Sequence, residues 1–295
     1  MAERLGAHSL VDAFKAQGVN SIFTLSGNHI MPIFDAVIDE PIKLIHTRHE
    51  AATVHMADAY ARLSGKVGIA MVTGGPGHAN AVSALYTAAM AESPVVLLSG
   101  HAPLNQLGKG AFQEMSQADI AAPLCKASWT CAGPQYLAAD FQLACAIAQS
   151  GRPGPVHLSL PADALESPLP NASATPSPSA PKLTLNAPLT SEKAQSIVTQ
   201  LRAAQKPVVI VGPRGCYRYA KQLHALSKAL GVPVIATESP RGVGDPSLGA
   251  FAEVLAQSDC VLLLEKRLDF TLKFGNAPTF KADARFIQID SEATE

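Results

Sequence analysis

Apolar runs of strand length alternate with stretches of helical periodicity along the first half of the chain. The predicted strands are residues 21–25, 41–45, 67–72 and 94–98. The predicted helices are a first one that ends near Gly18, residues 31–38, residues 51–62 and a small-residue helix that reaches Ala91. Alternation of this kind predicts a mostly parallel sheet with helices on both of its faces.

A similar pattern begins again near Ser191, with strands predicted at residues 207–211, 232–236, 260–264 and 285–289. Between the two patterns, residues 166–190 are rich in Pro, Ser, Ala and Thr and lack periodicity, which predicts an extended, solvated linker. The sequence therefore predicts an α/β protein with two doubly wound parallel-sheet domains, residues 1–165 and residues 191–295. Because the second domain stops just after a strand, we expect it to be a truncated Rossmann-like unit.

Composition and charge narrow the class of protein. The chain has 295 residues, of which 47% are hydrophobic and 16% are charged, as in globular proteins. A net charge of −1 argues against nucleic acid or an anionic membrane as a partner. No apolar run approaches the roughly 20 residues of a membrane-spanning helix, and the N-terminus lacks the apolar core of a signal peptide. These features predict a soluble cytoplasmic protein.

The cysteines are consistent with that compartment. They are odd in number, widely spaced and without a CxxC pair, so we expect reduced and mostly buried thiols. The five are Cys125, Cys131, Cys145, Cys216 and Cys260.

Glu50 is the first residue of chemical interest, because it lies where a predicted strand ends and a predicted helix begins. In open α/β sheets, ligands bind at this edge. A carboxylate here can share a proton with a nitrogen of a ligand. It can equally be an ordinary helix-start carboxylate that complements the helix dipole. The local sequence leaves both interpretations open.

Two turns have the glycine content of phosphate-binding loops. Residues 74–77 (Gly-Gly-Pro-Gly) join a predicted strand to a helix, but they lack the Lys-Ser/Thr pair of a P-loop and the GxGxxG spacing. Because no cation lies nearby in the sequence, a tight turn beside a neighbouring backbone is the favoured interpretation. Residues 212–215 (Gly-Pro-Arg-Gly) form a similar turn in the second domain. There, Arg214 could bind a phosphate with two hydrogen bonds if one were present.

Metal binding and hydrolase chemistry find little support in the sequence. His49-Glu50 begins like a HExxH zinc motif, but Thr53 stands where the second histidine should be. No Cys/His cluster has zinc spacing elsewhere, and no Gly-x-Ser-x-Gly elbow is present. The sequence therefore predicts no metal site built by this chain.

Several segments together resemble the thiamine-diphosphate enzymes of the acetolactate synthase group. The resemblance covers essentially the whole chain, and its motifs occur in the family's order. They are RHE with HMADAYAR within residues 48–62, TGGPGHAN at 73–80, AFQE at 111–114 and GRPGPVHL at 151–158.

This resemblance implies that the first domain binds the pyrimidine of the cofactor and that the second is the family's central domain. It gives Glu50 the role of hydrogen-bonding N1′ of the aminopyrimidine, which favours the tautomer whose 4′-nitrogen removes the proton from thiazolium C2. It makes His29 and Gln113 catalytic residues that face the reacting carbonyl. The cofactor-binding residues that it implies are Glu50, Gly27, Thr73, Gly74, Pro76, Gly77 and Asn80.

Two details of the resemblance bear on the subgroup. Residues 27–29 (Gly-Asn-His) resemble benzaldehyde lyase. The segment 267–275 is similar to 2-hydroxyacyl-CoA lyases and oxalyl-CoA decarboxylases, whose central domain holds ADP, and it makes Arg214, Arg267 and Asp269 candidate nucleotide-binding residues. However, Glu265 and Lys266 stand where relatives have a small Gly-Ala pair, which counts against ADP or FAD.

In the same family a third domain carries the GDG…N segment that binds Mg²⁺ and the diphosphate, and nothing in this sequence supplies that segment. We therefore expect Mg²⁺ to be bound by a domain not present here. We also expect a homodimer or homotetramer with its active site shared between chains, so that this chain alone is inactive.

The leading hypothesis is the N-terminal portion of a thiamine-diphosphate-dependent lyase, decarboxylase or carboligase (a transferase) acting on 2-keto acids or 2-hydroxy ketones. One alternative is a 2-hydroxyacyl-CoA lyase or oxalyl-CoA decarboxylase-like enzyme with ADP or CoA in the central domain. Another is a truncated homologue that catalyses nothing.

Overall fold

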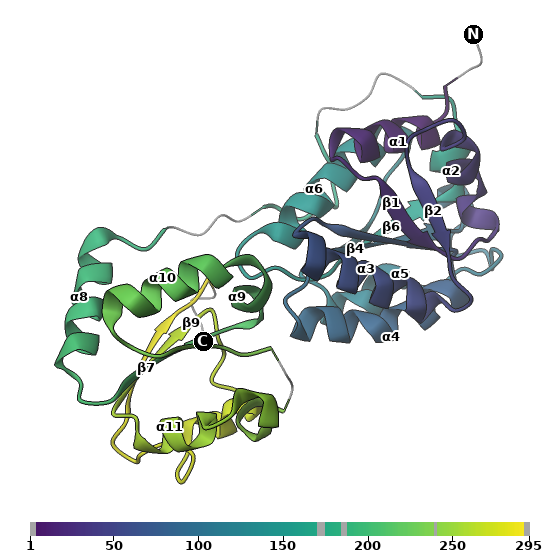
Figure 1. Cartoon of the computed structure of the whole chain (residues 1–295). Helices are drawn as coiled ribbons and strands as arrows, with labels where there is room; N and C mark the ends of the chain where they lie inside the picture. The colour runs from purple at the N-terminus through teal and green to yellow at the C-terminus, as the bar shows by residue number, and fades with distance from the viewer. Residues whose placement is uncertain (1–3, 170–174, 184–187, 239–240, 292–295) are drawn as a thin grey trace. The chain divides into compact units, whose positions relative to one another are not determined.

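The computed structural model describes residues 4–169, 175–183, 188–238 and 241–291. Contacts divide the chain into two compact units, residues 1–184 and 185–295. Each unit has one parallel sheet with helices on both faces (Figure 1). The predicted α/β fold with two parallel sheets is therefore confirmed.

The first sheet has six parallel strands in the order β2-β1-β3-β4-β6-β5. Its strands are β1 (Ser21–Thr24), β2 (Lys43–His46), β3 (Gly68–Val72), β4 (Val95–His101), β5 (Ala127–Thr130) and β6 (Val156–Pro161). Every residue of β3, β4 and β6 is buried, as expected for strands covered by helices on both faces. The last two strands, β5 and β6, are additions to the four that the apolar runs predict.

Helices cover this sheet in two layers, each with its own apolar core. One layer packs around Phe14 of α1 and Phe141 of α6, whose rings meet edge to face 4.8 Å apart. The other layer is formed by α3 and α4, which pack against each other around Val54 and Leu85. The helices of the unit are α1 (Gly6–Ala16), α2 (Met31–Ala36), α3 (Glu50–Ser64), α4 (Pro76–Met90), α5 (Gln117–Ala121), α6 (Leu137–Gln149) and α7 (Ala162–Glu166).

Local sequence explains where the two central helices begin. The backbone N–H of Ala51 donates to the ring Nδ1 of His49 at 3.1 Å, so His49 caps α3 and places Glu50 in its first turn. Gly75 precedes α4 with φ +61°, a conformation that glycine adopts without strain, and Pro76 opens the helix. Both helices therefore start at the carboxyl ends of their strands.

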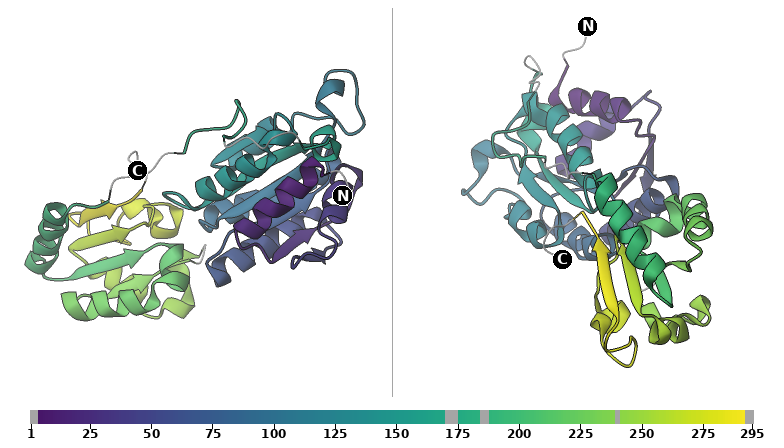
Figure 2. Two further views of the ribbon diagram at one scale, coloured as in Figure 1. Left: turned by 90° about the horizontal axis from the view of Figure 1, so that it is seen from above. Right: turned by 90° about the vertical axis from the view of Figure 1, so that its left-hand side faces the viewer.

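The second unit has a four-stranded parallel sheet in the order β10-β9-β7-β8. Helices α8 and α10 pack on one face around Leu201, and α11 packs on the other around Phe251 and Leu255 (Figures 1 and 2). The strands are β7 (Pro207–Val211), β8 (Val234–Ala236), β9 (Cys260–Leu264) and β10 (Arg285–Ile289). The helices are α8 (Ser191–Ala203), α9 (Pro213–Arg218), α10 (Ala220–Leu230) and α11 (Phe251–Gln257).

The stretch predicted as a solvated linker differs from that expectation in its described part. Ser177 is buried, and its backbone N–H and its Oγ donate to the two carboxylate oxygens of Asp140 at 2.7 and 2.6 Å. The prediction of solvation is therefore wrong for this residue, because a buried carboxylate on α6 offers two strong acceptors for it. Residues 170–174 and 184–187 of the stretch, and the chain end at Glu295, lie outside the described residues.

Four cysteines are free thiols, namely Cys125, Cys131, Cys145 and Cys260. Burial raises the pKa of each of the first three to about 12, so these thiols are poorly reactive. The side chain of Cys216 lies outside the described part. Within residues 4–291, apart from the gaps named above, no helix combines the length and apolarity needed to cross a membrane.

Candidate active site

The predicted site residues of the first unit gather at one edge of its sheet. Strands β2, β1, β3 and β4 are neighbours, and the segments that follow each of them start at the same carboxyl edge. These segments are the turn at 27–29, the start of α3 at Glu50, the turn at 73–77 and the loop at 111–116. In an open parallel sheet this edge is where ligands bind.

Glu50 and Asn80 meet across the starts of two helices. The amide Nδ2 of Asn80, on α4, donates to Oε2 of Glu50 at 3.0 Å. A Cβ on Gly77 would lie 3.5 Å from Oε1 of Glu50 and 2.8 Å from Cγ2 of Thr73, so the absence of a side chain keeps the carboxylate open on that side. Glu50 is half-buried, and within the described residues its Oε1 accepts no hydrogen bond. The carboxylate is thus held by one oxygen and open at the other.

His29 lies against the turn that follows β3. Its Nδ1 is 3.2 Å from Oγ1 of Thr73, and its ring stacks on the exposed ring of Phe112 with centroids 5.8 Å apart. A Cβ on Gly27 would lie 2.5 Å from Cβ of Thr73, so this position requires glycine. Burial lowers the pKa of His29 below its ordinary value, which favours the neutral imidazole, a form that can accept a proton.

The loop that carries Gln113 packs directly on the glycine turn. A Cβ on Gly75 would lie 2.6 Å from Cβ of Gln113, and one on Gly74 would lie 2.6 Å from the carbonyl oxygen of Gly100. Gln113 itself has φ +57°, an uncommon conformation for a residue with a side chain. A neighbouring backbone therefore does approach this turn closely, which accounts for Gly74 and Gly75 without a phosphate.

Phe112 and Gln117 are parts of this edge that the sequence analysis did not single out. Phe112 covers His29, and Gln117 is buried beneath the glycine turn, where its Oε1 accepts from the N–H of Gly75 at 2.8 Å. The signal for Phe112 is its place beside Gln113 in the AFQE motif. Nothing in the sequence marks Gln117 as part of the site, because a glutamine just outside the motif is most simply interpreted as exposed to solvent.

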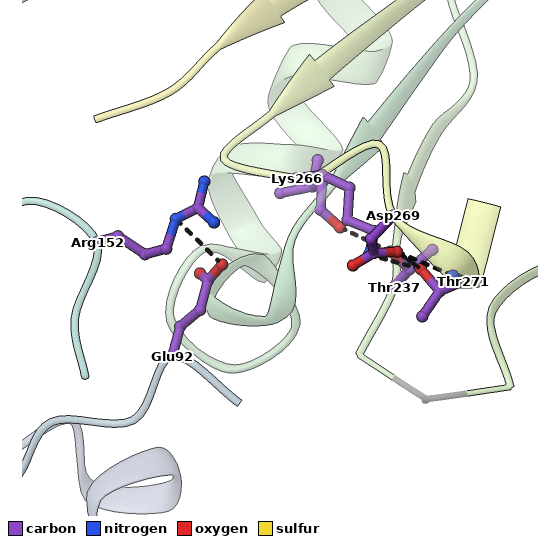
Figure 3. Close-up of polar contacts among 7 residues, drawn as sticks. Glu92, Arg152, Thr237, Lys266, Asp269 and Thr271 are labelled. Atoms are coloured by element: carbon purple, nitrogen blue, oxygen red, sulfur yellow. Dashed lines mark hydrogen bonds and ion pairs between the residues drawn. The ribbon is translucent and has the colours of Figure 1, made fainter. Parts of the chain in front are cut away.

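The candidate nucleotide residues of the second unit have charged partners within the protein. Arg214, in the first turn of α9 after β7, forms an ion pair with Glu265, which follows β9. Asp269 accepts from the N–H of Thr271 at 2.9 Å, and the buried Lys266 lies 3.4 Å from both oxygens of Asp269 and donates to Oγ1 of Thr271 at 2.8 Å. Figure 3 shows the side chains of Lys266, Asp269 and Thr271 pointing toward one another. Arg267 lies in the same segment.

The charge pairs of Arg214 and Lys266 count against ADP or FAD at this edge. A bound phosphate needs cations directed at it, whereas Glu265 already neutralises Arg214 and Asp269 already neutralises Lys266. A Cβ on Gly212 would lie 2.0 Å from the carbonyl oxygen of Glu265, so that backbone also closes over the turn. Among the described residues of both units, no group of three or more His, Cys, Asp or Glu side chains is placed to hold a metal ion.

Comparison with known proteins identifies the class that this fold and site define. Two models of one family match the chain: "Thiamine pyrophosphate enzyme, N-terminal TPP binding domain" over residues 4–120, and "Thiamine pyrophosphate enzyme, central domain" over residues 194–295. The chain belongs to the thiamine pyrophosphate enzyme family. The resemblance found in the sequence motifs is confirmed.

The relatives divide between two activities. The chain is 31% identical to a probable acetolactate synthase large subunit of Methanocaldococcus jannaschii, over 98% of this chain and 51% of the relative. It is 33% identical to the 2-hydroxyacyl-CoA lyase 2 of Danio rerio, over 92% of this chain and 50% of the relative. With the same enzyme of Xenopus laevis the identity is 43% over 56% of this chain and 25% of the relative. The chain spans about half the length of the curated relatives that it matches along most of its sequence.

Proposed function

We propose that this chain is the cofactor-activating part of a thiamine-diphosphate-dependent lyase, decarboxylase or carboligase that acts on 2-keto acids or 2-hydroxy ketones. The observation that carries the proposal is the carboxylate of Glu50. It stands at the carboxyl edge of the first sheet, is held by Asn80 and has its second oxygen open beside Gly77.

The residues at this edge fit the cofactor. A carboxylate with one free oxygen is the partner that a ring nitrogen of the aminopyrimidine requires. Gly27 and Gly77 allow Thr73 to pack closely beside this carboxylate, where a Cβ at either position would clash with it. Glu50, Thr73, Gly74, Pro76 and Asn80 complete the set that would hold it. Thiamine diphosphate, when bound, supplies an electron sink for carbanions formed beside a carbonyl.

The residues of this chain then have separate tasks. Glu50 holds and returns a proton at its Oε1, while Asn80 keeps the carboxylate in one rotamer. His29, fixed by Thr73 and Phe112, takes up or delivers a proton at the substrate carbonyl. Gln113 donates a hydrogen bond to the same carbonyl from the loop that covers the turn.

The remaining parts of the proposal come from the family resemblance. Mg²⁺ and the diphosphate would be held by protein outside this chain's two units. The complete site would form between chains of a homodimer or homotetramer. This chain by itself would then bind the cofactor weakly and catalyse nothing.

A second candidate is the cleavage of a 2-hydroxyacyl-CoA. The 43% identity to a 2-hydroxyacyl-CoA lyase 2 over 56% of this chain favours it. The form of this candidate that has ADP in the second unit is the less favoured one, because Arg214 is paired with Glu265 and Asp269 with Lys266. The two candidates share the cofactor and Glu50, and they differ in the substrate.

The test is a turnover screen of the intact protein with added thiamine diphosphate and Mg²⁺. The substrates are pyruvate, a 2-hydroxy ketone and a 2-hydroxyacyl-CoA. Turnover that requires the cofactor and is lost in Glu50→Gln supports the proposal, and the preferred substrate decides between the candidates. If calorimetry detects no binding of thiamine diphosphate and no substrate is turned over, the chain is a non-catalytic homologue and the proposal is wrong.

A further inference from the structure

Gln117 is a fully buried amide that joins three strand ends beneath the candidate active site. It is the first residue of α5 and is 1% exposed. Its Oε1 accepts from the N–H of Gly75 at 2.8 Å. Its Nε2 donates to the carbonyl oxygen of Gly100 at 3.0 Å and to Oγ of Ser159 at 3.1 Å. These partners follow β3 or lie within β4 and β6, so one side chain fixes three neighbouring strands.

The hydrogen-bonding pattern at this position requires an amide. The N–H of Gly75 can only donate and the carbonyl of Gly100 can only accept, so a side chain that satisfies both needs an acceptor and a donor. A carboxylate lacks the donor and an apolar side chain lacks both. The contact with Gly75 is buried, and a buried N–H without a partner is costly.

The turn that Gln117 holds controls the rest of the site. Gly75 immediately precedes α4, whose side chains include Asn80, the partner of Glu50. Thr73, in the same turn, contacts His29. A displacement of the turn would therefore move the residues that hold Glu50 and His29 together.

Buried Ser159 and His157, with half-buried Ser128, keep Gln117 in place. Oγ of Ser159 lies 3.4 Å from Nε2 of His157, and Nδ1 of His157 lies 2.8 Å from Oγ of Ser128. His157 also packs on His78, with ring centroids 4.5 Å apart. The result is a buried network with Gln117 as its contact to the glycine turn.

We propose that Gln117 is a positioning residue that fixes the turn at 73–77 in the shape that binds thiamine diphosphate. It acts through Gly75 and touches neither substrate nor cofactor. This proposal rests on the proposed function, because it assumes that the edge binds that cofactor. It deepens the proposed function by adding a residue that the family motifs do not mark.

The test compares Gln117→Met with Ser128→Ala in the intact protein. Gln117→Met keeps the length of the side chain and removes all three hydrogen bonds. Ser128→Ala removes part-buried hydrogen bonds of the same network, including one of 2.7 Å to the carbonyl oxygen of Ala118, without touching the turn. The readouts are the Kd of thiamine diphosphate by calorimetry with Mg²⁺ present, and the melting temperature.

We expect both variants to lower the melting temperature. Only Gln117→Met should raise the Kd, by roughly tenfold or more, because one buried hydrogen bond to the turn is lost. Gln117→Glu keeps the acceptor for Gly75, so its Kd should lie closer to that of the wild type. If Gln117→Met does not fold, Gln117→Asn replaces it, because a shorter amide cannot span the three partners and should raise the Kd at least threefold.

Two results would overturn the inference, and they differ in meaning. If the wild type binds thiamine diphosphate and Gln117→Met, or Gln117→Asn in its place, matches the Kd of Ser128→Ala, Gln117 is only structural and the proposed function stands. If the wild type does not bind thiamine diphosphate at all, the proposed function fails and this inference fails with it.

Discussion

At the residue scale, the central feature is a carboxylate whose two oxygens have different surroundings. Asn80 donates to Oε2 of Glu50 at 3.0 Å, and Oε1 faces the space left by Gly77. The sequence alone left Glu50 between a helix-start residue and a proton partner for a ligand. The contact with Asn80 favours the second role, because a carboxylate that only complements the helix dipole needs no partner from another helix.

Replacement of Asn80 by Ala should weaken catalysis by the intact protein without unfolding it. Loss of a hydrogen bond to a charged group costs about 1.5–3 kcal/mol, so kcat/KM should fall roughly 10- to 100-fold. Steady-state kinetics with the substrate found in the turnover screen measures this. Ser83→Ala is the matched control on the same helix, because Oγ of the exposed Ser83 donates only to the carbonyl oxygen of Asn80. Equal kinetics in the two variants would contradict the role of Asn80.

A residue of the site could be predicted from the sequence where a local pattern or motif marks it. Glu50 and the glycine turn lie at strand ends that the apolar pattern marks, and the family motifs supply Asn80, His29 and Gln113. Gln117 was not predictable, because its burial depends on hydrogen bonds to three segments far apart in sequence.

At the element scale, the strands that the sequence marks are those in which apolar residues predominate. Strand β6 was missed because His157 and Ser159 interrupt its apolar residues, so it lacks the continuous apolar run of β3 or β4. Both polar residues are in fact fully buried and hydrogen-bonded. Hydrogen bonds between side chains, which a hydropathy pattern cannot show, make this polar strand compatible with the interior of the sheet.

The buried histidines make the stability of the first unit depend on pH. Burial lowers the pKa of His78 to about 4 and holds the pKa of His157 well below 6.5. In the unfolded chain both take up protons below about pH 6.5. The folded state therefore has its full stability above that pH and loses it as the pH falls from 6.5 toward 4. The expected slope is about 1.4 kcal/mol per pH unit for each histidine.

Urea unfolding between pH 7 and pH 5 measures this effect, with the fluorescence of Trp129 as the probe. Trp129 is the only tryptophan of the chain and is buried in the first unit, so it reports on that unit. Nδ1 of His78 lies 2.9 Å from Oγ of Ser99. His78→Asn keeps a polar side chain for that contact and removes one titrating group, so its slope should be smaller than that of the wild type. A stability that does not change over this range would contradict the buried, neutral state of the two rings.

At the scale of the whole chain, two units with the same architecture carry different chemistry at their carboxyl edges. The edge of the first sheet presents a carboxylate with an open oxygen, whereas the edge of the second is closed by its own ion pairs. The sequence predicted both sheets and placed candidate residues at both edges. It could not show that Arg214 and Asp269 already have partners, because ion pairing depends on the side chains of Glu265 and Lys266 in three dimensions.

We therefore expect no binding of ADP or FAD to the second unit. Isothermal titration of the intact protein with each nucleotide should give no heat of binding up to millimolar concentration. Glu265→Gly removes the ion pair with Arg214, and any affinity for ADP should be higher than in the wild type. Micromolar binding of ADP or FAD by the wild type would contradict this account of the second edge.

The most direct test of the central claim is the rate of hydrogen exchange at C2 of thiamine diphosphate bound to the intact protein. NMR after quenched exchange in deuterated water measures this rate without a known substrate. We predict that Glu50→Gln slows the exchange at least 100-fold, because the amide cannot hold and return the proton. Exchange at the wild-type rate in Glu50→Gln, with the cofactor still bound, would contradict the role assigned to Glu50.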